Sequence, residues 1–297
     1  MKISDILKNK ATISFEIFPP KNKSGDISSI YHTIEELSQL NPDFMSVTYG
    51  AGGSNKDKTV EIASTIKNKY GIESVAHLTC ISSTKEEVLQ ICQQLKENHI
   101  ENILALRGDY PQDDPTFHKD CLEFHYAKEL NELITQNFPG DFCLSGACYP
   151  ETHQEADCFE DDLKALKEKV DAGAQYLITQ IFFDNNYYYR LVKEAQKRGI
   201  TVPIIAGIMP ITNSKSLLHT AKMCGCSIPY QLSTMIESYY HYPEAMKEIG
   251  INYATHQIID LITNGVDGIH IYTMNKPEIA QAIFQNIPTV LKELNHE

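Results

Sequence analysis

Short apolar runs alternate with amphipathic segments along the whole chain. Several of these runs are apolar at nearly every position, as in ILAL and PIIAGI. Such runs are typical of parallel strands that are covered on both faces, because neither face of the strand meets solvent. The predicted strands are Thr12–Phe18, Phe44–Tyr49, Ser74–Cys80, Asn102–Leu106, Phe142–Cys148, Tyr176–Phe182, Pro203–Met209 and Gly268–Thr273.

Amphipathic helices are predicted between these strands. Apolar residues recur at helical spacing from Ile27 to Leu37. Thr84 and Glu87 have the spacing of a capping box, in which a threonine begins a helix and a glutamate three positions later bonds back to it. Further helices are expected near Tyr230–Tyr240, near Ala254–Ile262 and after Lys276-Pro277.

Eight strand-then-helix units in series predict an α/β protein with a closed (β/α)8 TIM barrel rather than an open sheet. The sequence has no Pro-, Gly- or Ser-rich linker and no shift in composition, so residues 1–297 are predicted to form a single domain. Active sites of such barrels lie at the C-terminal ends of the strands. The polar residues at those ends are therefore the candidates for chemistry.

The chain is acidic, with 26 Lys and Arg against 39 Asp and Glu and a formal net charge of −13. This balance argues against binding of nucleic acid or of anionic membrane surfaces, which basic faces favour. The first residues lack the apolar stretch of a signal peptide, and no run approaches the roughly 20 apolar residues of a membrane helix. Eight cysteines without C-x-x-C spacing are interpreted as reduced thiols of a cytoplasmic protein, and Cys224-Gly-Cys226 is weak evidence for metal or redox chemistry.

Glu16 is the first candidate, because strand alternation separates it from its apolar neighbours. Phe15 and Ile17 fall on one face of the strand and Glu16 on the other. If the apolar face packs against helices, Glu16 points into the barrel mouth, where apolar surroundings favour a protonated carboxyl group that could act as a general acid. The alternative is a surface glutamate on a frayed strand end, which the rigid Pro19-Pro20 makes less attractive.

The second and third strands offer two further signals. Glycines in the segment 50–53 would let backbone N–H groups approach a phosphate, although a flexible turn explains the same residues. His77 and Thr79 share a strand face that alternation directs into the barrel. A single strand histidine is, however, more often a core residue than a catalyst.

The fourth strand ends in Arg107-Gly108-Asp109. Arg107 could bind a pyrophosphate through two parallel hydrogen bonds. Asp109 could form a hydrogen bond to a heterocycle or stabilise a cation. An ion pair within the loop explains the same residues equally well. Gln180, in the sixth strand, suits recognition of a ring that carries donors and acceptors, and Lys276 follows the eighth strand near the mouth.

These candidates form neither a convincing metal site nor a Ser-His-Asp triad. Glu16, His77 and Asp109 come from different strands, and no pair of histidines at i and i+4 accompanies them. An acid, an Arg/Asp pair, a glycine loop and several hydrogen-bonding groups suit instead a large cofactor that performs the chemistry itself.

Taken together, these segments resemble the methylenetetrahydrofolate reductase family, in its bacterial form that has the catalytic domain alone. The resemblance covers essentially the whole chain. It rests on SFEIFPP (14–20), SVTYGAGG (46–53), HLTC (77–80), LALRGD (104–109), YPETH (149–153), KVDAGAQYLITQIFFD (169–184) and GIMP (207–210).

The resemblance implies an oxidoreductase that reduces 5,10-methylenetetrahydrofolate to 5-methyltetrahydrofolate in a barrel with non-covalently bound FAD. NADH or NADPH would reduce the flavin and leave, and the folate would take its place. By similarity, Glu16 is the general acid that protonates N10 of the folate, Asp109 helps to bind folate and tunes the flavin, and Gln180 contacts the pterin. Relatives are commonly oligomeric, so a homo-oligomer with small-molecule substrates is expected.

The resemblance also assigns further binding residues. The flavin-contact positions are Thr48, Tyr49, Ala51, His77, Arg107, Gly108, Asp109, Tyr126, Tyr149, His153, Ala156, Asp162 and Lys169. Ser216 and Lys276 fall at folate-contact positions. The charges of the helix that carries Asp162 and Lys169 are equally typical of a solvated face.

The chain departs from the family pattern at several of these positions. The family carries a glutamine and an aromatic residue in the stretch that is Ser216–Thr220 here, and commonly an arginine in place of Lys276. Ala165 and Glu168 replace polar and basic residue types on the adenosine side.

Two other functions fit the same residues: another FAD-dependent barrel oxidoreductase, resembling proline dehydrogenase, and a non-catalytic flavin- or folate-binding protein. The choice between NADH and NADPH is left open.

Overall fold

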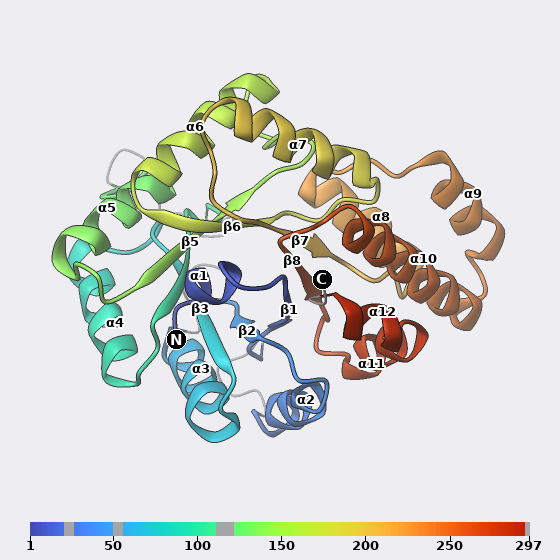
Figure 1. Cartoon of the computed structure of the whole chain (residues 1–297), viewed down its shortest axis with the longest axis horizontal. Helices are drawn as coiled ribbons and strands as arrows, with labels where there is room; N and C mark the ends of the chain where they lie inside the picture. Colours follow the sequence, from blue (N-terminus) through green and yellow to red (C-terminus); the bar gives the residue numbers. More distant parts are fainter. Residues whose placement is uncertain (21–26, 50–55, 111–121, 295–297) are drawn as a thin grey trace.

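The computed structural model describes residues 1–20, 27–49, 56–110 and 122–294. Within these ranges, eight parallel strands close into a barrel in sequence order, as the pattern predicted. Figure 1 shows the helices arranged around this barrel. The strands are β1 (Thr12–Ile17), β2 (Phe44–Val47), β3 (Glu73–Thr79), β4 (Asn102–Leu106), β5 (Cys143–Cys148), β6 (Ala174–Thr179), β7 (Ile204–Ile208) and β8 (Gly268–Tyr272).

One short helix precedes β1, and at least one helix follows each strand, as the (β/α)8 pattern requires. The helices are α1 (Ile3–Leu7), α2 (Ser28–Ser38), α3 (Lys56–Tyr70), α4 (Lys85–Glu97), α5 (Ala127–Asn137), α6 (Phe159–Asp171), α7 (Asn185–Lys197), α8 (Ser214–Cys224), α9 (Tyr230–Tyr239), α10 (Pro243–Thr263), α11 (Pro277–Asn286) and α12 (Pro288–Glu293). The predicted capping box is confirmed at the start of α4. The Glu87 N–H donates to Thr84 Oγ1 at 3.2 Å, and the Thr84 N–H donates to Glu87 Oε2 at 2.9 Å.

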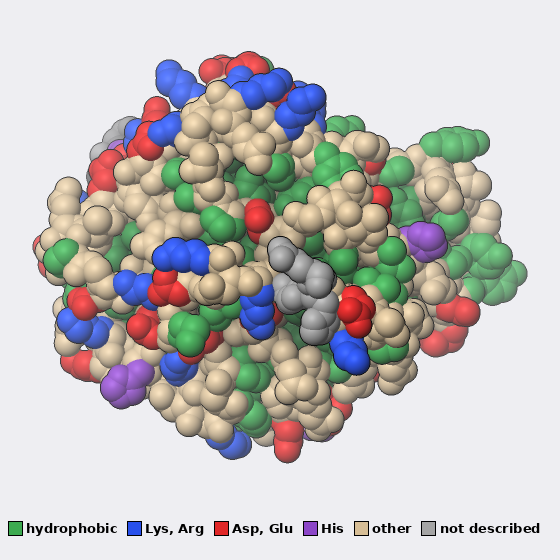
Figure 2. All heavy atoms as spheres, in the orientation of Figure 1, with side chains coloured by type: hydrophobic (Ala, Val, Ile, Leu, Met, Phe, Trp, Pro, Cys, Tyr) green, Lys and Arg blue, Asp and Glu red, His purple; other side chains and the backbone are tan. Residues whose placement is uncertain are grey.

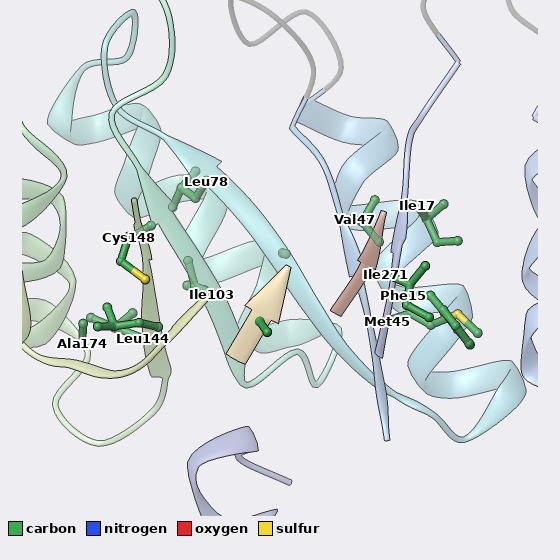
Figure 3. Packing of buried hydrophobic residues seen from close by; sticks show 14 of the residues in the cluster. Phe15, Ile17, Met45, Val47, Leu78, Ile103, Leu144, Cys148, Ala174 and Ile271 are labelled. Carbon is green, nitrogen blue, oxygen red and sulfur yellow. The ribbon is translucent and has the colours of Figure 1, made fainter. Parts of the chain in front are cut away.

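Alternate strand residues pack outwards against the helices. Phe15 and Ile17 of β1 and Met45 and Val47 of β2 are fully buried in this outer layer, and Figure 3 shows them clustered with Ile271 of β8. Burying one such side chain contributes on the order of 1.5–3 kcal/mol relative to leaving it exposed. The outer layer therefore fixes the strand faces, and with them the residues that point inwards.

The N-terminal end of the barrel interior is filled. Ile3 of α1 joins a cluster that includes Phe44, Val75 and Tyr176, and Figure 1 shows α1 inside the ring of strands. The Ile3 N–H donates to the side-chain oxygen of Asn102 at 2.9 Å. Because this end is closed by apolar side chains, a ligand site has to lie at the other end.

Some predicted boundaries were wrong around β6 and β7. The predicted strands reached Phe182 and Met209, but the observed ones end at Thr179 and Ile208. Apolar residues beyond these ends, such as Ile181 and Met209, pack in a separate cluster with α8, α9 and α10 instead of continuing the sheet. Their hydrophobicity is thus explained by helix packing rather than by strand pairing.

The last long helix was also predicted too short. The expected segment Ala254–Ile262 is the C-terminal part of α10, which begins at Pro243. Met246, in the first half of α10, packs in the α8–α10 cluster, whereas Ala254 and Ile258 pack against the barrel. Because the two halves face different partners, a single apolar stripe does not run along the helix.

The surface carries charges of both signs. Figure 2 shows Lys and Arg interspersed with Asp and Glu over the face in view, and hydrophobic side chains gathered at the right-hand edge over α9. Tyr230 of α9 is 88% exposed. Among the helices in the described ranges, none has the length and apolar character needed to cross a membrane.

Candidate active site at the C-terminal mouth of the barrel

A cavity of about 560 Å³ opens at the C-terminal ends of the strands. Its volume is in the range of roughly 300–1,000 Å³ that is common for cofactor and substrate sites. Ten of the residues selected from the sequence line it: Glu16, Thr48, Tyr49, His77, Arg107, Gly108, Asp109, Tyr149, His153 and Gln180. The structure therefore brings together side chains from strands that are far apart in the chain.

Glu16 points into the barrel, as the alternation of β1 predicted. Its side chain is buried and lines the cavity, so the alternative of a surface glutamate is wrong. Three groups surround its Oε2 atom: Ser46 Oγ at 3.5 Å, His77 Nε2 at 3.4 Å and His270 Nε2 at 3.7 Å. A carboxyl group is thus held inside the barrel at the edge of a space that a ligand can enter.

His77 lies beside Glu16 with an unused ring nitrogen. Although its Nε2 atom is within ion-pair distance of Glu16, it forms no hydrogen bond with any residue that the structure describes. Burial lowers the pKa of His77 to about 4; the Glu16 charge opposes this effect, and the neighbouring His270 adds to it. At neutral pH His77 is therefore a neutral imidazole that can bond a ligand.

Acid is expected to destabilise the fold through His77. The unfolded chain binds a proton on this histidine near pH 6.5, but the folded protein does so near pH 4. The free energy of unfolding should therefore fall as the pH drops from about 6.5 towards 4, by up to roughly 3 kcal/mol. Urea unfolding at a series of pH values measures this. His77→Gln should flatten the curve in that window, and His32→Gln, on the exposed face of α2, should not.

A His77→Gln variant with the same pH slope as the wild type between pH 4 and 6.5 would contradict this assignment. Above pH 6.5, His77 is neutral in both the folded and the unfolded chain. The free energies of unfolding of the wild type and of His77→Gln should therefore depend on pH in the same way there.

Arg107 is held by a carboxylate from the neighbouring loop. Its guanidinium makes two hydrogen bonds to Glu155, one of them at 2.9 Å from Nη2 to Oε1, and it also packs over the Tyr110 ring. The Glu155 bond raises the pKa of Arg107. The sequence left open an ion pair within the Arg107–Asp109 loop, but the described partner of Arg107 is Glu155, which follows β5.

Gly108 is a glycine for a steric reason. Its φ angle is +87°, and a Cβ atom there would lie 3.0 Å from Cβ of Thr79. A side chain at this position would be strained and would crowd the wall of the cavity. The next residue, Asp109, is exposed and lines the cavity, so its carboxylate is available to a ligand.

Tyr149 and His153 form the wall that follows β5. Their rings meet edge to face with centroids 4.6 Å apart. Asp162 Oδ2 accepts the backbone N–H of His153 at 2.8 Å, and burial raises the pKa of Asp162. Lys169 donates to the Ala147 carbonyl, and burial lowers the pKa of Lys169. Asp162 and Lys169 thus stand behind the cavity wall and not on a fully solvated face.

Gln180 lies just after the end of β6 and lines the cavity. Its side-chain oxygen accepts the N–H of Ile181 at 2.8 Å. This bond fixes the amide and leaves its N–H groups as the donors that Gln180 can present to a ligand.

Other predicted residues lie outside the cavity lining. Tyr126 is 61% exposed at the start of α5, and Ser216 is exposed in the first turn of α8. Lys276 is also exposed and donates to Thr212 Oγ1 at 3.2 Å. Ala156 is half-buried and donates its N–H to the His153 carbonyl. Ala51 and the rest of the glycine segment 50–53 fall outside the described residues.

Two residues of β8 were missed in the sequence. Tyr272 lines the cavity and donates to the Thr179 carbonyl at 2.7 Å. His270 is fully buried next to Glu16. The signal was present, because Ile269 and Ile271 alternate with His270 and Tyr272 in the same way that Phe15 and Ile17 alternate with Glu16.

Known proteins share both the sequence pattern and the fold. The family model for methylenetetrahydrofolate reductase matches residues 2–288. A 5,10-methylenetetrahydrofolate reductase of Pectobacterium carotovorum is 39% identical over 277 residues, which cover 93% of this chain and 90% of that protein. The corresponding Escherichia coli protein is 38% identical with the same coverage.

A longer plant relative and a solved structure give two further comparisons. A methylenetetrahydrofolate reductase (NADH) of Arabidopsis thaliana is 35% identical over 97% of this chain, which spans about half (51%) of the plant protein. An uncharacterized Clostridium thermocellum protein that binds two copies of 5-methyl-5,6,7,8-tetrahydrofolic acid has a TM-score of 0.67 at 18% identity, covering 97% of this chain and 98% of that one. At this identity, the structural likeness supports the barrel fold alone.

Proposed function

The chain belongs to the methylenetetrahydrofolate reductase family, and we propose that it reduces 5,10-methylenetetrahydrofolate to 5-methyltetrahydrofolate with bound FAD and with NADH or NADPH as reductant. The observation that carries this proposal is the buried Glu16 carboxyl at the edge of a cavity lined by polar groups from several strand ends. A proton donor beside a space for a large ring system is what the folate step needs. The name of the plant relative supports NADH as the reductant.

The residues of the cavity fit FAD. His77 has a buried ring nitrogen with no described hydrogen-bond partner, and the missing Cβ of Gly108 keeps the wall open. The guanidinium of Arg107 lines the cavity, and its Nη N–H groups that are not bonded to Glu155 would bind the pyrophosphate. Tyr149 and His153 would flank the cofactor, with Asp162 and Lys169 supporting them from behind. When bound, FAD supplies hydride transfer, taking a hydride from the nicotinamide and passing it to the folate.

The residues of this chain would control the proton and the charge of the folate step. We propose that Glu16 protonates N10 of the folate, which opens the ring and leaves a cationic iminium group at N5. Asp109, exposed at the mouth, would stabilise that positive charge. Gln180 would donate its amide N–H groups to the pterin ring.

Loss of the Arg107 side chain is expected to weaken FAD binding by about tenfold or more, the cost of a charge-assisted hydrogen-bond pair. The matched control is Glu155→Ala, because Arg107→Ala and Glu155→Ala break the same ion pair. Flavin fluorescence titration of the apoprotein gives the two dissociation constants. If the ion pair matters only for structure, both variants should weaken binding equally, and that result would contradict the pyrophosphate role.

The activity itself is tested by nicotinamide oxidation. We expect NADH or NADPH to be oxidised at a sustained rate under anaerobic conditions only when methylenetetrahydrofolate is present, with 5-methyltetrahydrofolate as the product. Oxidation that is independent of the folate, or no oxidation by the FAD-loaded protein, would overturn the proposal.

Two broader properties follow from the same resemblance. We propose that the protein acts in the cytoplasm as a homo-oligomer, and that its ligands are small molecules rather than nucleic acid or membranes. The acidic net charge of −13 supports the second statement. Light scattering on the FAD-loaded protein would give the number of subunits.

A further inference from the structure

A chain of buried polar side chains lies beneath Glu16, inside the barrel. Ser46 Oγ is 3.5 Å from Glu16 Oε2 and 3.2 Å from His270 Nε2. On the other side of the imidazole, His270 Nδ1 is 2.8 Å from Ser14 Oγ, which in turn is 3.2 Å from the carbonyl oxygen of Ile269. The chain therefore runs from Glu16 through Ser46, His270 and Ser14 to a backbone carbonyl.

These side chains are sealed from solvent. Ser14, Ser46 and His270 have no exposed surface. Phe44 stacks on the His270 ring with centroids 5.9 Å apart, and Tyr272 meets its edge at 5.3 Å. Polar groups in such a place destabilise a fold unless each is hydrogen-bonded, and apolar side chains could fill the same volume. Their presence in the barrel interior therefore calls for a role beyond packing.

The imidazole can bond Ser46 and Ser14 in two ways, one for each state of Glu16. When Glu16 is protonated, it can donate to Ser46, Ser46 to His270 Nε2, Nδ1–H to Ser14, and Ser14 to the Ile269 carbonyl. When Glu16 is ionised, the three bonds between side chains can reverse, so that Ser14 donates to Nδ1 instead of to the Ile269 carbonyl, Nε2–H donates to Ser46, and Ser46 donates to the carboxylate. The second arrangement holds one proton fewer, which is the proton that Glu16 has released.

We propose that His270 is a positioning residue for the folate step, holding the Glu16 carboxyl through Ser46 in both its protonated and its ionised form. This inference rests on the proposed function, because it assigns His270 to the proton donor of that reaction. A histidine suits the place, since it presents one donor and one acceptor at opposite sides of its ring and can exchange them by changing tautomer. The 3.5 Å link between Ser46 and Glu16 is the longest of the series, and such contacts commonly shorten when substrate binds.

This series of hydrogen bonds can position the Glu16 carboxyl group, but it cannot reprotonate it. The series ends at the Ile269 carbonyl, which can accept a hydrogen bond but has no proton to give. The proton that Glu16 loses must therefore return from the cavity side. On that side, the titratable groups that interact with Glu16 within the described part of the chain are His77 of β3 and Tyr272 of β8.

A metal site is the competing explanation for Glu16, His77 and His270. Within the described ranges, however, no group of three or more His, Cys, Asp and Glu side chains has the arrangement to hold a metal ion. The serine contacts on both ring nitrogens of His270 also occupy the atoms that would bind a metal. Hydrogen bonding to Glu16 is the role that the geometry supports.

The test separates the two half-reactions of the FAD-loaded enzyme in a stopped-flow spectrometer. His270→Leu should slow flavin reoxidation by methylenetetrahydrofolate on the order of 10- to 100-fold, the effect of a misplaced reacting group, while flavin reduction by NADH or NADPH stays unchanged. His270→Gln should recover part of the loss, because its amide keeps one donor and one acceptor. Equal slowing of both half-reactions would mean a merely structural role and would overturn the proposal.

Two further variants localise the effect. Ser46→Ala removes the link between His270 and Glu16 and should slow the same half-reaction, which keeps the test available if His270→Leu does not fold. Ser145→Ala is the matched control, since Ser145 is an equally buried barrel serine that donates to the Ile103 carbonyl at 3.2 Å and lies in β5, away from this series. Ser145→Ala should react like the wild type.

A double-mutant cycle decides whether His270 acts through Glu16. In a Glu16→Gln background, His270→Leu should cause no further slowing, because the proton donor is already gone. Additive losses would overturn the positioning role alone. A Glu16→Gln variant that reoxidises at the wild-type rate would instead overturn the proposed function, so the two failures can be told apart.

Discussion

Replacing Glu16 with glutamine is expected to slow the folate half-reaction by about 10²- to 10⁴-fold, the range typical for loss of a general acid, while leaving flavin reduction intact. The amide has nearly the shape of the carboxyl group but no acidic proton to give to N10. Hydride transfer from the nicotinamide to FAD needs no proton donor at this position. The two half-reactions should therefore respond differently to a single change.

Stopped-flow absorbance of the flavin measures both steps on the same protein. The matched control is Glu151→Gln, another carboxyl-to-amide change near the mouth, since Glu151 accepts the Ser227 N–H and does not line the cavity. That variant should keep both rates. If Glu16→Gln lowered the two rates by the same factor, its carboxyl group would not be the specific acid of the folate step.

Gly250→Ala is expected to destabilise the protein by about 3 kcal/mol or more, at the upper end of the usual range for overpacking. A Cβ atom at this position of α10 would lie 1.6 Å from the backbone oxygen of Ile211 and 2.5 Å from its carbonyl carbon. Alanine is a better helix former than glycine by about 1 kcal/mol, but that gain is smaller than the cost of displacing a main chain. The steric effect should therefore decide the sign.

Thermal unfolding followed by circular dichroism provides the measurement, with a decrease of roughly 2–4 °C in melting temperature for each kcal/mol. Asn252→Ala serves as the control, because Asn252 is exposed on the same helix and its replacement changes helix propensity without a close contact. The control should melt at or slightly above the wild-type temperature. A Gly250→Ala protein as stable as Asn252→Ala would show that α10 does not press against the segment after β7.

Strand alternation predicted much of the site because it acts locally. Phe15 and Ile17 lie on the outer, apolar face of β1, so the residue between them, Glu16, had to point inwards. The same alternation of strand faces predicted that His77 lies in the cavity. Applied to β8, it would also have found His270 and Tyr272. The barrel itself followed from the serial order of strands and helices, which leaves few other topologies.

Contacts between different loops could not be predicted in this way. Glu155 forms an ion pair with Arg107 because the segments after β4 and β5 come together at the mouth of the barrel. The local sequence of either segment does not predict this contact. The extent of α10 was hidden for a related reason, since its two halves pack against different partners. The positions of Ser216 and Lys276 also depend on how α8 and the end of β8 are packed, and their roles as folate contacts stay predictions.

Anaerobic mixing of the photoreduced, FAD-loaded enzyme with methylenetetrahydrofolate tests the central claim most directly. We predict that the oxidised flavin spectrum returns and that one equivalent of 5-methyltetrahydrofolate forms for each flavin reoxidised. A flavin that stays reduced in the presence of the folate, or one that is reoxidised without formation of the methyl product, would contradict the account.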